Sequence, residues 1–310
     1  MLPAAALAFN SDEWLAKREV LSREAERLQV AYTSCVARIS EPAQDVTLPI
    51  ERNADGSIRA SVTAKKAQVL LELGLIWGSE VVVTQLSTNG VVEARVEADG
   101  CVIDRDTKSG WVEGHAKAFY LGNEVEGDGI YFSFEEEFVT IYANTKIRVK
   151  DQKFDTNAIM GGGGKDARRD AEIAAKRTDF DRKDGVVLFD GAVSVSDSEY
   201  SLGADRLYAF LDGTNSLKRI VADGSVTVTN GTRSGSCPRA AYVKSLGRVT
   251  MYGDPGSPAK LADGGGKRSE VEGRKISFWL DSEQVEVEGS TLTVDGVSGG
   301  MDGIIRQAVK

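Results

Sequence analysis

The chain contains the sequence Val125-Glu-Gly-Asp-Gly-Ile-Tyr-Phe-Ser-Phe-Glu-Glu-Glu-Phe-Val-Thr-Ile141 and later the related sequence Val271-Glu-Gly-Arg-Lys-Ile-Ser-Phe-Trp-Leu-Asp-Ser-Glu-Gln-Val-Glu-Val287. The two stretches align without a gap. The shared residues keep one offset throughout, and they are Val125 with Val271, Glu126 with Glu272, Gly127 with Gly273, Ile130 with Ile276, Phe132 with Phe278, Glu137 with Glu283 and Val139 with Val285. The repeat therefore predicts two similar folds in one polypeptide.

Within the repeat, apolar residues alternate with polar ones. Successive side chains of a β-strand point to opposite faces, so Ile276 and Phe278 are predicted to share one face, with Ser277 on the other face toward water. Val285 and Val287 alternate with Glu286 in the same way. Each copy of the repeat is thus predicted to form strands with one continuously apolar face.

The same period-two pattern extends over most of the chain. Val81–Leu86 and Val91–Glu97 flank Asn89-Gly90, which is the strongest short hairpin signal. A shorter echo pairs Asp190-Gly-Ala-Val-Ser-Val195 with Asp223-Gly-Ser-Val-Thr-Val228, and each copy is interpreted as a turn that leads into a strand. Strand units that cannot bury a face alone stack into solenoids or rolled sheets.

These patterns predict an all-β protein with two antiparallel β-rolls of the jellyroll kind and an N-terminal amphipathic helix. The helix is expected to begin at Ser11 and to stop before Pro42. The expected segments are a signal-peptide remnant at 1–10, the helix at 11–41, a first roll at 45–150, a Gly-rich linker with a short charged helix at 151–178, a second roll at 179–294 and a tail at 295–310.

The composition excludes several classes of partner and site. The net charge of -9 and the lack of a basic stripe argue against nucleic acid as a partner. Cys35, Cys101 and Cys237 are an odd number without Cys-x-x-Cys spacing, so they specify neither a zinc site nor a disulfide framework. They are predicted to be small buried thiols, although one bridge among them stays open.

Candidate catalytic residues are few, and each has a simpler interpretation. His115 is the single histidine and no Gly-x-Ser-x-Gly elbow accompanies it, so a Ser-His or Cys-His mechanism lacks support. Gly161–Lys165 lacks the spacing of a phosphate-binding loop, and Glu135–Glu137 are interpreted as solvated acids on a turn. The sequence predicts no catalytic residue, no metal site and no cofactor.

The second half resembles the lipopolysaccharide-transport periplasmic proteins that share the OstA-like fold, in their LptA type. The resemblance rests on ordered blocks over about 110 residues, namely Asp184–Val195, Ala204–Leu207, Ile220–Val228, Ala241-Tyr242 and Gly247–Met251. The first half resembles the LptC type more loosely, through Leu48-Pro-Ile50, Asp55-Gly56, the region of Ala64 and Ala67, and Asn144–Val149. It departs from that type in showing no transmembrane anchor.

The resemblance implies a periplasmic, non-enzymatic carrier of lipopolysaccharide or a similar glycolipid, in which V-shaped rolls hold acyl chains inside and pair through strand edges with other transport proteins. The groove is predicted to contain Ile130, Phe132, Val139, Ile141, Val193, Val195, Leu207, Val226, Val228, Val249, Met251, Ile276, Phe278, Val285 and Val287. Two alternatives stay open: a β-solenoid enzyme acting on polysaccharide, and an envelope scaffold or adhesin with a closed core.

Overall fold

The computed structural model describes residues 11–293, except 88, 121–122, 150–169, 199, 213–216, 231–232, 264–268, 280–284 and 290. The predicted signal-peptide remnant, the glycine run of the linker and the tail from 295 lie outside these residues. In the described part, no helix has the length and apolar character needed to cross a membrane.

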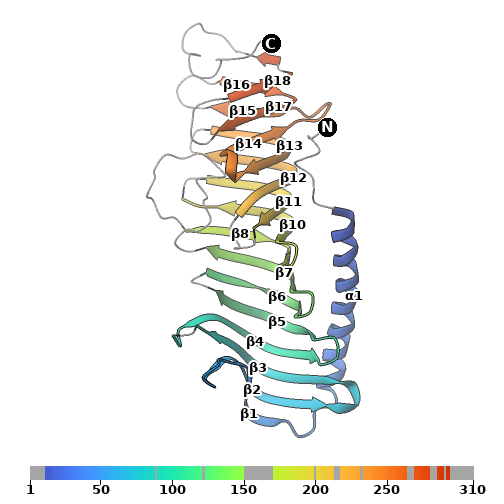
Figure 1. The fold of residues 1–310 in the computed structure, drawn as a ribbon. Coiled ribbons are helices and arrows are strands. Elements are labelled where there is room, and N and C mark those ends of the chain that lie inside the picture. Colours follow the sequence, from blue (N-terminus) through green and yellow to red (C-terminus); the bar gives the residue numbers. More distant parts are fainter. Residues whose placement is uncertain are drawn as a thin grey trace. The chain divides into compact units, whose positions relative to one another are not determined.

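One helix precedes a long series of antiparallel strands, which confirms the predicted fold class (Figure 1). The elements are α1 (Ser11–Val36), β1 (Ala43–Arg52), β2 (Ile58–Leu70), η2 (Leu71–Leu73), β3 (Leu75–Leu86), β4 (Val92–Asp104), β5 (Ser109–Tyr120), β6 (Asn123–Ser133), β7 (Phe138–Val149), β8 (Ala171–Ala175), β9 (Arg177–Asp181), β10 (Val186–Ser196), β11 (Tyr200–Leu211), β12 (Leu217–Asn230), β13 (Arg233–Val243), η3 (Lys244–Leu246), β14 (Arg248–Tyr252), β15 (Ala259–Asp263), β16 (Ser269–Gly273), β17 (Lys275–Trp279), β18 (Val285–Glu288) and β19 (Thr291–Thr293).

The chain divides into two compact units. Among the described residues, unit 1 comprises those up to Ala116 together with Gly129–Glu135, and unit 2 comprises Lys117–Asp128 together with those from Glu136 onward. The division runs through β5 and β6, so these two strands contribute to both units. Each unit is described separately below.

Helix α1 belongs to unit 1 and packs on β3 and β4. It begins at Ser11, as predicted, and ends at Val36, earlier than predicted. Its buried face follows helical spacing through Leu21, Ala25 and Leu28. The Arg27 guanidinium on this helix donates a hydrogen bond of 2.5 Å to the Asp104 carboxylate at the end of β4, which fixes the helix on the sheet.

Strands β1 to β4 of unit 1 form an antiparallel meander. Leu48 pairs with Val62, Val62 with Val83, and Val83 with Val96, so apolar residues meet across neighbouring strands. The hairpin predicted around Asn89-Gly90 joins β3 to β4, and the Gly90 amide donates a hydrogen bond of 3.0 Å to the Ser87 carbonyl. Turn chemistry and the alternation of apolar residues thus set the register here.

In unit 2 the long strands change register in the middle. The pairing of β10 shifts between Asp190 and Val193, and the pairing of β12 shifts between Asp223 and Val226. The interpretation of the Asp-Gly echoes as turns was wrong. They are β-bulges inside continuous strands, where residues with positive φ occur as pairs: Gly191 with Ala192 and Gly224 with Ser225. An Asp-Gly pair suits both features because both require a positive φ.

The bulges divide unit 2 into two arms. The first part of β10 pairs with β9 and its last part pairs with β8. Similarly, the last part of β13 pairs with β14, whereas its first part pairs with β15. The bent strands therefore carry one sheet into two arms, which is the arrangement of a rolled sheet.

The short charged helix predicted within 151–178 is wrong over its described end, where Ala171–Ala175 form strand β8. This strand pairs with β7 on one side and with β10 on the other. Alternating burial of Ala171, Ile173 and Ala175 supports the strand. Pairing on both edges outweighs the modest helix propensity of alanine, since propensity is a weak prior beside tertiary contacts.

Candidate apolar binding site

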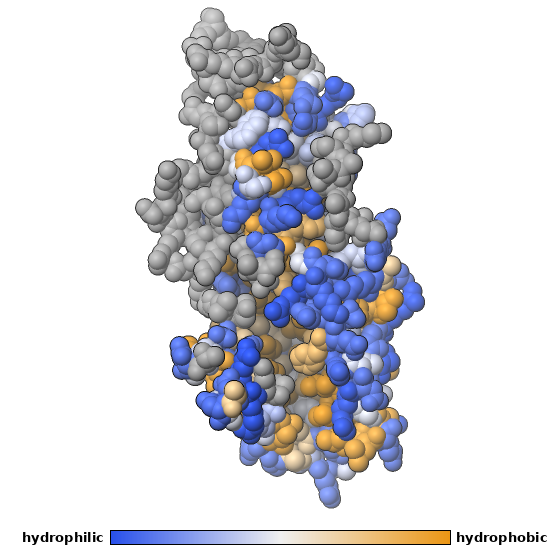
Figure 2. Space-filling view, viewed as in Figure 1, coloured by the Kyte–Doolittle hydropathy of each residue, from blue (hydrophilic) through white to orange (hydrophobic). Residues whose placement is uncertain are grey.

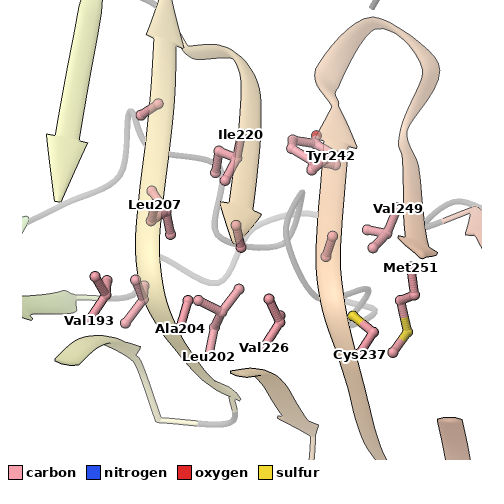
Figure 3. Packing of buried hydrophobic residues seen from close by; sticks show 14 of the residues in the cluster. Val193, Leu202, Ala204, Leu207, Ile220, Val226, Cys237, Tyr242, Val249 and Met251 are labelled. Carbon is pink, nitrogen blue, oxygen red and sulfur yellow. The ribbon is translucent and has the colours of Figure 1, made fainter. Parts of the chain in front are cut away.

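The interior of unit 2 contains an apolar cluster that receives side chains from both arms. Phe189, Leu207 and Ile276 come from one arm, and Val193, Val226 and Val271 come from the other. Figure 3 shows such side chains pointing toward one another from successive strands. The buried members of the cluster are Ile173, Ala175, Phe189, Val193, Val195, Leu202, Ala204, Leu207, Ala209, Leu217, Ile220, Ala222, Val226, Cys237, Ala240, Tyr242, Val249, Met251, Ala259, Val271 and Ile276.

Few members of this apolar cluster can ionise, and the buried acids Asp179 and Asp181 of unit 2 are not among its members. Cys237 and Tyr242 are the only titratable side chains among the described members of the cluster. Burial raises the pKa of the Cys237 thiol to about 11, so the thiol stays neutral at ordinary pH. The cluster is therefore suited to hydrocarbon and unsuited to any charged ligand group.

Burial within the cluster decreases toward the last strands. Ile276 is fully buried at 0% exposure, whereas Phe278, Val285 and Val287 are half-buried and pack against the cluster from β17 and β18. The apolar interior thus reaches solvent at β17 and β18, next to a tightly packed centre.

Unit 1 has a smaller and more open interior. Its buried members are Ala64, Val81, Cys101, Val112 and Ala116. Half-buried residues complete it, among them Ile130 and Phe132. In Figure 2, apolar side chains line a recess in the lower part of the face in view, between hydrophilic walls. Burial raises the pKa of the Cys101 thiol to about 12, which marks the same neutral environment as around Cys237.

The predicted groove residues are divided among three places. Those of unit 2 from Val193 to Val287 lie in or against its cluster, and they are Val193, Val195, Leu207, Val226, Val228, Val249, Met251, Ile276, Phe278, Val285 and Val287. Ile130 and Phe132 lie against the cluster of unit 1. Val139 and Ile141 lie on β7 in unit 2 and are not among the described members of either cluster.

The two copies of the repeat make the same close contact. A Cβ atom added to Gly127 would lie 2.3 Å from Cγ2 of Ile141, and one added to Gly273 would lie 2.7 Å from Cγ1 of Val287. Gly127 aligns with Gly273, and Ile141 aligns with Val287. Each glycine thus makes room for a residue of a later strand, β7 for Gly127 and β18 for Gly273, which explains why both copies keep it.

One sequence-based orientation was wrong. Ser277 was expected to face water, yet it is 3% exposed and its Oγ lies 3.4 Å from the Oγ1 of Thr250 on β14. The outer face of β17 is therefore covered as well. Alternation identifies which residues share a face, but it does not show whether the second face is exposed.

Several residues that line the interior were missed by sequence reasoning. They include Leu202, Ile220 and Tyr242, which lie in the cluster beside predicted members. Their signal was present, because Leu202 and Ala204 alternate, as do Ile220 and Ala222, and Ala240 and Tyr242. Small alanines in these pairs weaken the apparent hydrophobicity of each strand.

No group of three or more His, Cys, Asp or Glu side chains in the described part of the chain is placed to hold a metal ion. His115 is exposed on β5. Cys35, Cys101 and Cys237 are all buried and free, so the bridge left open by the sequence is not present.

Residues 172–298 match the family model described as LptA/(LptD N-terminal domain) LPS transport protein. No curated protein matches the chain. Among solved structures, the chain resembles the crystal structure of LptH, the LptA homologous periplasmic component of the lipopolysaccharide transport device of Pseudomonas aeruginosa. That similarity has 15% identity and a TM-score of 0.35, and it covers 41% of this chain and 95% of that chain.

Proposed function

We propose that this chain is a periplasmic, non-enzymatic carrier that shields the acyl chains of lipopolysaccharide or a similar glycolipid on the way to an outer membrane. The supporting observation is that the family match and the apolar cluster fall on the same part of the chain. The residues that match the LPS transport family, 172–298, include the strands that build the neutral apolar interior of unit 2.

The chemistry of this interior suits acyl chains and excludes their head group. Transfer of each CH₂ from water into an apolar site contributes about 0.8 kcal/mol, so a chain of lipid length is held strongly without any specific bond. Phosphates and sugars would lose their water in the cluster, whose members offer few polar partners, and they therefore stay outside. Binding of this kind needs no covalent step.

Acyl chains are proposed to enter at the half-buried members of the cluster, Phe278, Val285 and Val287. The centre of the cluster is closed around Val226 and Ile276, so a chain that reaches it must move the two arms apart. Release is then favoured by the re-packing of the same side chains. A carrier that closes again after each transfer avoids leaving a large apolar surface in water.

Neighbouring transport proteins are proposed to join through strand edges. Among the described strands, β1 pairs with β2, and β18 pairs with β17. A strand with one paired edge presents free backbone groups on the other, and such groups accept an added strand.

Photo-crosslinking tests the proposal with a matched pair of neighbouring positions on β10. Val193 is 3% exposed and belongs to the cluster, whereas Ser194 is exposed on the opposite face. A photoreactive phenylalanine analogue at Val193 should crosslink to lipopolysaccharide, and the same group at Ser194 should not. Ser277 is unsuitable as a control because it is buried.

Two results would contradict the carrier. Equal crosslinking from both positions would indicate non-specific adsorption of the glycolipid. No crosslinking from Val193 or from Phe278, in variants that keep the wild-type circular dichroism spectrum, would indicate a sealed core and favour the envelope scaffold.

A further inference from the structure

One edge of unit 1 is formed by the β2–β3 turn, the β4–β5 turn and the end of β6. Leu75 pairs with Asp104, which places the first two turns side by side. The Arg105 amide donates a hydrogen bond of 3.2 Å to the Gly74 carbonyl, and the Phe134 amide donates one of 3.0 Å to the Lys108 carbonyl. We call this surface, Leu71–Gly74 with Arg105–Lys108 and Phe134, the turn edge.

The turn edge exposes large apolar side chains to solvent. Leu71 is 78% exposed, Leu73 is 38% exposed and Phe134 is 62% exposed. Single exposed apolar residues are common, but a group of three on adjoining turns points to a partner.

Unit 2 contains the same turn, with Leu246 at the position of Leu73 but with a different first residue. The helical turns η2 and η3 both end at a glycine in the left-handed conformation, Gly74 and Gly247 respectively. In each, the glycine amide bonds to the carbonyl of the first residue of the turn. The position of Leu71 is occupied by Lys244 in unit 2. The turn geometry therefore does not require an apolar residue at Leu71.

The charges around the apolar side chains are mixed in sign. Arg105 and Lys108 are exposed beside the exposed acids Glu72, Asp106 and Glu135. Such a surface has little net attraction for a strongly charged partner. Apolar side chains on convex turns, surrounded by both signs of charge, fit the interface of a bilayer, where apolar groups enter the acyl region and charged groups stay at the head groups.

The apolar surface continues from the turn edge into unit 1. The rings of Phe134 and Phe132 are in edge-to-face contact, with centroids 5.1 Å apart. Phe132 in turn packs against the interior cluster of unit 1. A hydrocarbon chain that leaves a bilayer at Phe134 would thus meet apolar side chains without a polar break.

We propose that the turn edge of unit 1 docks on the surface of a phospholipid bilayer by inserting Leu71, Leu73 and Phe134. The docking itself is independent of the proposed carrier function. Its second consequence, that acyl chains pass along Phe134 and Phe132 into unit 1, rests on that function.

Flotation of the full chain with phosphatidylcholine vesicles, without glycolipid, tests the docking. The combined substitutions Leu71→Ser, Leu73→Ser and Phe134→Ser should lower partitioning by about 100-fold or more, because each large apolar side chain that inserts contributes about tenfold. The control is Leu246→Ser, which removes a leucine of 50% exposure from the equivalent turn of unit 2 and should change partitioning less than about twofold.

Fluorescent labels test which turn enters the bilayer. The three native cysteines are buried, so a polarity-sensitive thiol dye will react with a new cysteine on the surface. Glu72→Cys and Ser245→Cys place the dye at equivalent exposed positions of η2 and η3. Vesicles should shift the emission to shorter wavelength at position 72 and leave it unchanged at position 245.

The outcomes separate docking from carriage. Wild-type protein that fails to float, or a triple variant that floats as well as wild type, overturns the docking even if Val193 crosslinks to glycolipid. Binding that requires anionic phosphatidylglycerol and disappears with salt also overturns it, because the apolar side chains would not be responsible. If the triple substitution instead abolishes self-association in sedimentation experiments and wild type ignores vesicles, the turn edge is a protein interface.

Discussion

In unit 2, Ile276 of the repeat is 0% exposed, whereas the aligned Ile130 in unit 1 is half-buried, and the next aligned pair, Phe132 and Phe278, is half-buried in both units. Ile130 and Ile276 occupy the same place in the repeat. The same alternation of residues therefore determines which face is apolar in both units, but it does not determine how far the interior is closed.

The difference in closure follows from the residues on the other strands. The cluster of unit 2 includes large side chains such as Phe189, Leu207 and Tyr242. The buried members of the apolar cluster of unit 1 are mostly small, among them Ala64, Cys101 and Ala116, whereas large buried side chains of that unit such as Trp77 and Tyr131 are not members. Small residues leave more of each neighbour exposed. Unit 1 is thus better suited to admit a ligand, and unit 2 to retain a packed interior.

The largest effect is expected from a carboxylate placed at the matched positions of the repeat. Ile276→Asp buries an unpaired acid in a closed cluster and should lower the free energy of unfolding of unit 2 by about 4 kcal/mol or more. Ile130→Asp keeps some contact with water and should cost unit 1 about 1–2 kcal/mol. Hydrogen exchange during urea unfolding assigns each loss to its unit. Equal losses would mean that the two interiors do not differ.

The repeat glycines should show a smaller difference. Gly127→Ala and Gly273→Ala, which both lie in unit 2, are each expected to destabilise that unit by about 1–3 kcal/mol, because the new methyl group overlaps Ile141 or Val287. Val287→Ala should largely restore the Gly273→Ala variant. Ile141→Ala should restore the Gly127→Ala variant less well, since the Ala143 carbonyl oxygen lies 3.0 Å from the added atom, closer than the Glu288 carbonyl oxygen at 3.2 Å in the other copy. Urea unfolding of the four variants measures this, and full recovery in both pairs would contradict it.

The repeat and the alternation pattern predicted the fold class, the helix start and the β3–β4 hairpin because each depends on local residue spacing. They did not predict the bends of β10 and β12. Asp190-Gly191 and Asp223-Gly224 carry a positive-φ signal that is common to turns and bulges. Only the pairing of the flanking segments with different strands distinguishes the two.

For the candidate site, the sequence predicted the shared face but not its environment. Ser277 is buried because β17 is covered on both faces, and no pattern in β17 itself carries that information. Ala171–Ala175 become a strand only because β7 and β10 pair with them. Both errors concern contacts between segments that are distant in sequence, which a single sequence does not display.

A smaller effect, which depends on pH, is expected from the Asp104 carboxylate on the outer face of unit 1. Burial alone would raise the pKa of Asp104, but hydrogen bonds from Arg27 and from the amides of Thr107 and Asp106 hold it below its ordinary value of 3.8. Because the pKa of Asp104 is lower in the folded protein than in the unfolded chain, the carboxylate stabilises the fold fully at pH values above its unfolded-state pKa. This stabilisation is lost as the pH falls through its folded-state pKa. Helix α1 should therefore exchange hydrogen faster below about pH 4.

Substitution tests this assignment. Asp104→Asn should remove part of the acid dependence of α1 and cost about 0.5–1 kcal/mol, because Arg27 is half-exposed and solvent screens the pair. The control is Asp223→Asn in unit 2, where the pair with Arg239 is exposed on both sides. An unchanged acid dependence in the Asp104 variant would show that other groups control α1.

The last difference between the units concerns the two interior thiols. Burial raises the pKa of Cys101 to about 12 and that of Cys237 to about 11, so neither thiol forms much reactive thiolate in the closed state. Iodoacetamide should then react only when a unit opens and the thiol regains its ordinary value near 9. The closed-state values alone make Cys237 the more reactive thiol. The half-buried neighbours of Cys101 predict the reverse order, because unit 1 should open more easily than unit 2. Cys101 should then react about tenfold faster than Cys237, which corresponds to a difference of about 1.4 kcal/mol in the free energy of opening. Mass spectrometry of the two peptides over time measures both rates, and faster labelling of Cys237 would reverse the proposed difference between the interiors.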